Sequence, residues 1–96
     1  MSPLKRKKLN KIRTELDKLD NSLIKLIKKR TNLVNKVLKL KDKKKEIIDN
    51  KRIKIILRNI RKKSITNKID PKITNRIWKN MIWSYIDYEK RNFKKK

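Results

Sequence analysis

The amino-acid sequence predicts an all-α fold of three helices, one long, one short and one of medium length, in an intertwined homodimer. The first observation is a run of apolar residues spaced alternately three and four apart, the heptad pattern of one long helix. The run comprises Leu9, Ile12, Leu16, Leu19, Leu23, Leu26, Leu33, Val37 and Leu40. The second observation is composition. The 96 residues include no Gly and two Pro, which disfavours β-hairpins and glycine-rich phosphate loops.

The first helix is expected to start at Ser2-Pro3, an N-cap followed by Pro at the first helical position. After a basic lead-in at residues 1–8, it is expected to run to about Lys41 or Asp42, a length of ~60 Å. No other segment is long enough to cover such a helix. We therefore expect its far half to pack against a second copy of the chain.

Two shorter helices are expected in the second half of the chain. Residues 42–48 interrupt the heptad and indicate a connector, and Asp49 is a plausible N-cap for a short helix. Residues 62–69 are polar and indicate a loop, after which Asp70-Pro71 starts a third helix that ends near Phe93. The tail, residues 94–96, is expected to fray. The whole chain, 1–96, is expected to form one domain, with inward residues Ile53, Ile56, Leu57, Ile60, Ile73, Ile77, Trp78, Met81, Ile82, Tyr85 and Phe93.

Composition narrows the function classes. The chain has no Cys and no His, which disfavours disulfides, thiolate nucleophiles and most zinc or haem sites, so no metal or cofactor is expected. No apolar run approaches the ~20 residues of a membrane span, and the N-terminus lacks the apolar region of a signal peptide. We expect a cytoplasmic protein without a membrane partner.

The net charge of +24 is compatible with a basic nucleic-acid-binding protein. However, the sequence is rich in Lys, Ile and Asn and lacks Ala and Gly, the bias that A/T-rich codons impose on any protein. Since no nucleic-acid recognition motif accompanies the charge, we expect no nucleic-acid partner. That protein class and a plain helical dimerisation module stay open as alternatives.

One position of the heptad seam is charged. Arg30 falls where another Leu or Val is expected, and a guanidinium in an apolar interior is unfavourable unless an anion meets it. Lys41 lies eleven residues later on the same face, ~16 Å along the axis, whereas Arg13 lies seventeen residues earlier, ~25 Å away. If Arg13 and Arg30 serve one site, Arg13 has to come from a second, antiparallel copy. The alternative is a structural role, with Arg30 fixing the helix register or forming a buried salt bridge with Glu89.

The third helix carries a matching polar position. Glu89 follows Tyr85 by four residues on the expected buried line, where a carboxyl is unfavourable unless paired or protonated. Arg52, three residues after Asp49, can point into the same space. We therefore expect Arg30, Lys41, Arg52 and Glu89 to converge between the helices, with Arg13 arriving from the partner.

These residues together resemble the short, all-helical, dimeric chorismate mutases. The resemblance extends from about Leu9 to Phe93 and is most specific in the spacing of Arg13, Asp20, Arg30 and Lys41. The remaining matching residues are Leu9, Ile12, Leu16, Asp17, Leu19, Leu23, Leu26, Val34, Val37, Ile48, Asp49, Arg52, Ile69, Asp70, Pro71, Ile77, Trp78, Met81, Ile82, Tyr85 and Glu89.

The resemblance implies an isomerase that converts chorismate to prephenate, a Claisen rearrangement at the branch toward Phe and Tyr. It implies that Arg30 and the partner's Arg13 hold the two substrate carboxylates, and that Lys41 reaches a carboxylate and the ether oxygen. It further implies that Arg52 supports the anionic side of the site and that Asp49 meets the ring hydroxyl. Such a reaction needs no nucleophile, metal or proton shuttle; it needs a compact conformer and cations where negative charge develops.

Three positions depart from the family pattern. Ile53 stands where the family often has a Glu that binds the substrate hydroxyl, Tyr85 where a small Ser is common, and Glu89 where Gln is common. Ile53 and Tyr85 leave open a sister activity on the same fold, isochorismate pyruvate lyase. The resemblance places Glu89 opposite Lys41 at the ether oxygen.

A carboxylate cannot donate a hydrogen bond to an ether oxygen, so Glu89 has to be protonated to assist there. We therefore predict that turnover of chorismate declines as the pH rises from mildly acidic to alkaline. Initial rates across that range measure it, and a flat profile contradicts this role for Glu89.

Overall fold

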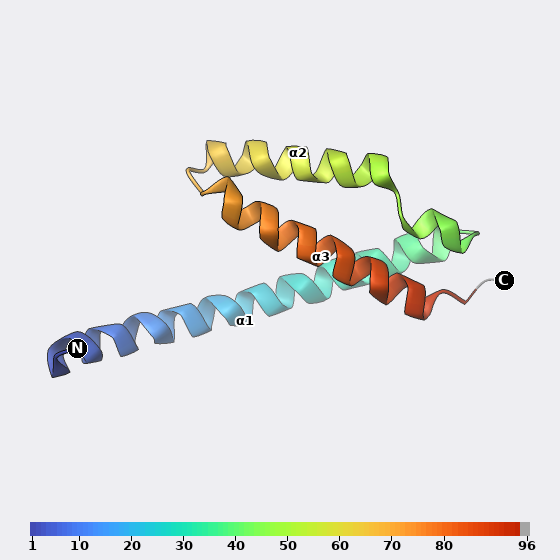
Figure 1. The fold of residues 1–96 in the computed structure, drawn as a ribbon. Helices are drawn as coiled ribbons and strands as arrows, with labels where there is room; N and C mark the ends of the chain where they lie inside the picture. Colours follow the sequence, from blue (N-terminus) through green and yellow to red (C-terminus); the bar gives the residue numbers. More distant parts are fainter. Residues whose placement is uncertain (95–96) are drawn as a thin grey trace. The chain divides into compact units, whose positions relative to one another are not determined.

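The computed structural model describes residues 1–94, which form three α-helices, one short 3-10 helix and no strand (Figure 1). Helix α1 spans Pro3–Leu40, the 3-10 helix η1 spans Lys44–Ile47, α2 spans Asn50–Thr66 and α3 spans Pro71–Asn92. The all-α class and the order of long, short and medium helices are therefore confirmed. Within this part of the chain, no helix combines the length and the apolar character needed to cross a membrane. Backbone contacts divide the chain into two compact units, Met1–Leu33 and Val34–Lys96.

The first unit is a single run of α1. Ser2 Oγ accepts a hydrogen bond of 3.2 Å from the backbone N–H of Lys5, and Pro3 is the first helical residue, as predicted for this N-terminus. Most of the basic lead-in, residues 1–8, is therefore already helical.

The apolar seam of this unit lies open to solvent in the single chain. From Ile12 to Leu33, its large apolar side chains are between 47% and 65% exposed. They are Ile12, Leu16, Leu19, Leu23, Ile24, Leu26, Ile27 and Leu33. A long helix with such a stripe is stabilised mainly by packing against another surface, because helix propensity alone gives little stability in water.

The second unit contains the hydrophobic core. Helices α2 and α3 lie side by side as an antiparallel hairpin (Figure 1), and α3 also contacts η1. Among residues 1–94, four apolar residues are buried, namely Leu38 from the last turns of α1, Ile47 from η1, and Ile82 and Ile86 from α3. Partly buried neighbours complete this core: Ile48, Ile53, Ile56, Leu57 and Phe93. The core thus joins residues from all four helical segments.

The predicted inward residues are only partly confirmed. The four on α2 are half-buried, and Ile82 on α3 is buried. Ile73 and Ile77 were predicted to point inward as well, but they are 55% and 49% exposed. Both belong to the first two turns of α3, and in the single chain they form an apolar surface without cover.

The predicted loop at residues 62–69 is wrong over most of its length, because α2 continues to Thr66. Ser64 explains why this polar stretch is helical. Its Oγ donates to the carbonyl of Ile60 at 2.6 Å and shares a hydrogen bond of 2.6 Å with Thr74 Oγ1 of α3. Ser64 is consequently buried, at 3% exposure, without an unsatisfied hydroxyl. The polar residues thus form an amphipathic turn of helix with one buried, hydrogen-bonded position.

The true turn between α2 and α3 is short and starts with a Schellman motif. The N–H of Ile69 donates to the carbonyl of Ser64 at 2.8 Å, and the N–H of Lys68 donates to that of Ile65 at 3.1 Å. This pattern requires a left-handed residue, and Lys68 occupies it with φ of 59°. Asp70 then caps α3 by accepting from the N–H of Lys72 at 2.9 Å, as predicted.

Helix α3 ends at Asn92. Of the tail predicted to fray, Lys94 is exposed and non-helical. Lys95 and Lys96 lie outside the described residues.

The small core makes stability sensitive to Ile47, which is 3% exposed in a segment expected to be a mere connector. We predict that Ile47→Ala lowers the free energy of unfolding by about 3 kcal/mol, from lost apolar burial and the cavity left behind. Urea denaturation at one fixed protein concentration measures this change. Ile55→Ala, at a position 45% exposed, is the matched control and should change stability by less than about 1 kcal/mol. Equal losses in both variants would contradict this view of the core.

Candidate active site

An ion pair connects the end of α1 to α3. Lys41 directly follows the last residue of α1, and its Nζ donates to Oε1 of Glu89 at 3.0 Å. The side chains are 17% and 8% exposed, so both partners are largely withdrawn from water. Burial of Glu89 on α3 is therefore confirmed, and its partner is Lys41, the residue expected to stand opposite it. Such a pair leaves a cation and a carboxyl facing each other inside the protein.

Beside Lys41 lies an open hollow of about 410 Å³. Its lining includes two of the predicted site residues, Lys41 and Asp49, and is completed by Glu46, Ile48, Asn50 and Lys51. The two lysines and the two carboxylates balance, so this hollow has no net charge by itself. Attraction for a doubly negative ligand therefore has to come from additional cations.

Asp49 is placed by its role as the N-cap of α2. Its Oδ1 accepts a hydrogen bond of 3.0 Å from the backbone N–H of Arg52, which confirms the predicted cap. The residue is exposed, as is Arg52. Arg52 is not among the residues that line the hollow, whereas Asp49, Asn50 and Lys51 at this end of α2 are.

Arg30 is withdrawn from solvent. It is half-buried, and its Nε atom has no significant contact with water. This end of the side chain is therefore shielded from bulk solvent at Nε. Arg13 lies on the same continuous helix seventeen residues earlier, which corresponds to ~25 Å, and it is exposed. One copy of the chain therefore does not bring the two arginines together.

The two unusual positions, Ile53 and Tyr85, occupy different environments. Ile53 is half-buried and packs against the apolar core. Tyr85 is half-buried, and its ring meets that of Tyr88 edge-to-face, with centroids 6.4 Å apart and an interplanar angle of 88°. This geometry is favourable for aromatic pairs. Tyr85 thus belongs to a small aromatic cluster one turn before Glu89.

Sequence reasoning missed a second link between α1 and α3. Tyr88 Oη donates to Asn35 Oδ1 at 2.9 Å in a partly buried setting. A buried Tyr normally has a partner for its hydroxyl, which was the available signal. The partner lies 53 residues away, so no local pattern could identify it.

The chain matches a known protein family. The family model described as Chorismate mutase type II matches residues 12–90. No curated protein and no solved structure matches the chain. The matched region includes every predicted site residue, from Arg13 to Glu89.

The Lys41–Glu89 pair predicts a specific stability contrast. Lys41→Met removes the donor and leaves the Glu89 carboxyl buried, which should lower the free energy of unfolding by about 1–3 kcal/mol. The control is Arg91→Met, which breaks the Arg91–Asp87 pair; that pair is also 3.0 Å long, but its side chains are 65% and 70% exposed. We expect the control to change stability by no more than about 0.5 kcal/mol in urea denaturation. Equal effects would show that burial does not distinguish the two pairs.

Proposed function

Because the chain belongs to the type II chorismate mutase family, we propose that it converts chorismate to prephenate in the synthesis of Phe and Tyr. In this rearrangement the ether C–O bond breaks while a C–C bond forms, within one molecule and without a covalent intermediate. The observation that carries the proposal is the Lys41–Glu89 pair beside the hollow that Asp49 also lines. A cation held there can stabilise the negative charge that develops on the ether oxygen.

Lys41 has the central role in this proposal. Its ammonium donates to the ether oxygen and to a nearby carboxylate of the substrate, exchanging part of its contact with Glu89 for the ligand. Glu89 stands on the opposite side of the same oxygen, to which a carboxyl can donate a hydrogen bond only when it carries a proton. Asp49 at the cap of α2 meets the ring hydroxyl, and Arg52 supports the anionic side of the site.

Arg30 and the partner's Arg13 complete the site by gripping the two carboxylates. Arginine suits this task because its planar fork can form two parallel hydrogen bonds to a carboxylate. Holding both carboxylates favours the compact conformer in which the reacting carbons approach each other. Since the hollow near Lys41 carries balanced charges, these two arginines supply the excess positive charge for a dianion.

A homodimer is part of the proposal, supported by the exposed surfaces of the single chain. The seam of α1 is about half exposed along its length, and so are Ile73 and Ile77 on α3. Burying such stripes against another copy recovers roughly 25 cal/mol per Å² of apolar surface. An antiparallel arrangement of two α1 helices brings Arg13 of one copy toward Arg30 of the other and yields two equivalent sites.

Isochorismate pyruvate lyase is the second candidate, favoured by Ile53 and Tyr85. Ile53 cannot hydrogen-bond a substrate hydroxyl, and the Tyr85 ring occupies more space than the serine common in the family. A changed shape on this side of the site favours a different substrate isomer. Product identification separates the two activities, because the mutase forms prephenate from chorismate and the lyase releases pyruvate from isochorismate.

The proposal is tested by the loss of ultraviolet absorbance of chorismate, with identification of the product. We predict that the wild-type protein forms prephenate and that Arg13→Ala and Arg30→Ala each lower turnover by about 100-fold or more. An equal, co-refolded mixture of the two variants should recover about one quarter of the wild-type activity. Half of its dimers are mixed, and each mixed dimer has one intact site of two.

The control mixture combines Arg30→Ala with Lys41→Ala. These two residues serve a site from the same chain, so no mixed dimer regains a complete site and activity should stay low. Recovery in both mixtures, or in neither, would contradict an Arg13 supplied by the partner. A folded wild-type protein that leaves chorismate unchanged but cleaves isochorismate to pyruvate would replace the mutase by the lyase.

A further inference from the structure

The hydrogen bond between Tyr88 and Asn35 lies next to the Lys41–Glu89 pair in the chain. Both links join the last turns of α1 and the residue after it to α3, at 2.9 Å and 3.0 Å respectively. On α3 they start from neighbouring residues, Tyr88 and Glu89. On the α1 side they end six residues apart, about 9 Å along a helix axis.

This arrangement fixes the rotation of α3 about its own axis. Neighbouring residues of an α-helix project about 100° apart around the axis, so the two links diverge from one point of α3. A single link acts as a pivot, whereas two diverging links hold both the rotation and the sliding of the helix. The Tyr88 link therefore restrains α3 next to Glu89, in addition to the packing of Ile82 and Ile86 in the core.

Two further contacts hold Tyr88 in place. Its ring meets Tyr85 edge-to-face, and Asn92 Nδ2 donates to its backbone carbonyl at 2.8 Å. The ring, the backbone carbonyl and the hydroxyl of Tyr88 thus each make a contact. These contacts hold the hydroxyl in a fixed position for its hydrogen bond to Asn35.

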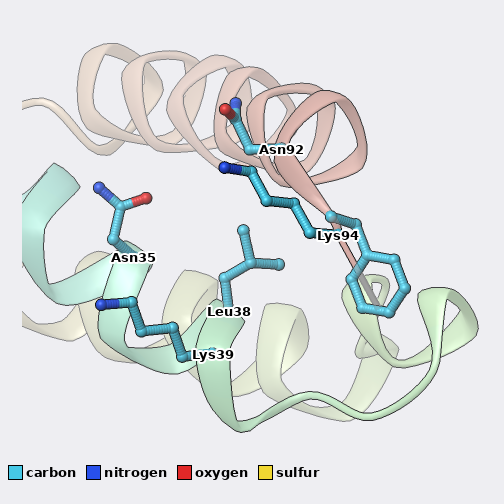
Figure 2. Close-up of a pocket in the computed structure, with 6 residues that line it drawn as sticks. Asn35, Leu38, Lys39, Asn92 and Lys94 are labelled. Carbon is cyan, nitrogen blue, oxygen red and sulfur yellow. The ribbon is translucent and has the colours of Figure 1, made fainter. Parts of the chain in front are cut away.

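The surroundings of Asn35 allow the Tyr88 hydroxyl to be removed without leaving the Asn35 amide unsatisfied. Asn35 lines a hollow of about 320 Å³, together with Leu38, Lys39, Asn92, Phe93 and Lys94. Figure 2 shows Asn35 and Leu38 at the end of α1 facing the end of α3, which carries Asn92. Water that enters this space can bind the Asn35 amide when the Tyr88 hydroxyl is absent, so the amide is not left buried without a partner.

We propose that Tyr88 and Asn35 are positioning residues for the proposed rearrangement, which hold the Glu89 carboxyl in register with Lys41 and the substrate ether oxygen. The inference rests on the proposed function, and neither residue touches the reacting atoms. The Tyr88–Asn35 hydrogen bond between α1 and α3 would then affect catalysis as well as packing. The contribution to turnover should exceed the contribution to stability.

The test compares Tyr88→Phe and Asn35→Ala with wild type, after wild-type turnover of chorismate has been established. We expect kcat to fall roughly tenfold in each variant, well below the ~100-fold loss that a 1 Å displacement of a reacting group can cause. KM should change less than about threefold, because the arginines that bind the carboxylates are untouched. The double variant should lose no more than either single variant, since both changes delete one bond.

Asp87→Asn is the matched control. Asp87 precedes Tyr88 on α3 and is exposed, and its Oδ2 accepts a hydrogen bond of 3.0 Å from Nε of Arg91, which is also exposed. This variant should retain wild-type kcat. Circular dichroism and urea denaturation verify that all variants keep the wild-type fold.

Action through Glu89 is tested in a Glu89→Ala background. With no carboxyl left to position, Tyr88→Phe should lower kcat by less than about twofold there. The same tenfold loss in both backgrounds, or a loss that simply follows reduced stability, would overturn the proposal in favour of a general structural role. An unchanged kcat in Tyr88→Phe would overturn it directly.

A spectroscopic measurement separates this inference from the proposed function. The side-chain carboxyl resonance of Glu89, observed by ¹³C NMR in the ligand-free protein, should shift in Tyr88→Phe and stay unchanged in Asp87→Asn. A shift in a protein that does not convert chorismate supports the positioning contact and refutes only the mutase. An unchanged resonance in an active enzyme refutes the positioning contact and leaves the mutase intact.

Discussion

One buried ion pair in the second unit, between Lys41, just beyond α1, and Glu89 in α3, joins two helices that also share the apolar core. Burying one charge alone has a large desolvation cost, and an opposite charge next to it offsets much of that cost. Each residue of the pair therefore favours burial of the other. The pair brings Glu89 of α3 to Lys41, which lines the hollow together with Asp49. The carboxyl of Glu89 is paired with the ammonium of Lys41. In the proposed function, the substrate competes with Glu89 for this ammonium. The fold and the proposed chemistry therefore draw on the same contact.

Local sequence signals predicted the fold well wherever a backbone group needed a partner close in the chain. Ser2-Pro3, Asp49 and Asp70-Pro71 marked three helix starts correctly, because a cap and its N–H donors lie within three residues. The buried Glu89 was predictable from its place on the apolar line of α3. The polar residues 62–69 were wrongly predicted to form a loop. Ser64 can be buried there because it forms a hydrogen bond with Thr74, which lies on another helix. The burial of Ile47 and the Tyr88–Asn35 hydrogen bond were not predicted for the same reason, because both depend on tertiary contacts.

The chain as a whole is strongly positive, whereas the hollow at the candidate site has no net charge. The net charge of +24 is spread along the helices, while the hollow beside Lys41 contains two lysines and two carboxylates. A strongly positive surface speeds the approach of a dianion and makes that approach sensitive to salt. Recognition at short range requires cations at fixed positions instead. Arg30, half-buried on the seam of α1, is the residue that we propose for this role.

The turn between α2 and α3 shows what a chain without glycine gives up. A Schellman motif requires one left-handed residue, and with no Gly in the sequence that position falls to Lys68. A side chain with a Cβ is disfavoured in this conformation by roughly 1 kcal/mol. The strain is local and exposed, far along the hairpin from Lys41 and Glu89, so it weakens hairpin closure without disturbing the ion pair. The absence of Gly from the sequence thus lowers the margin of stability at a tight reversal of the backbone.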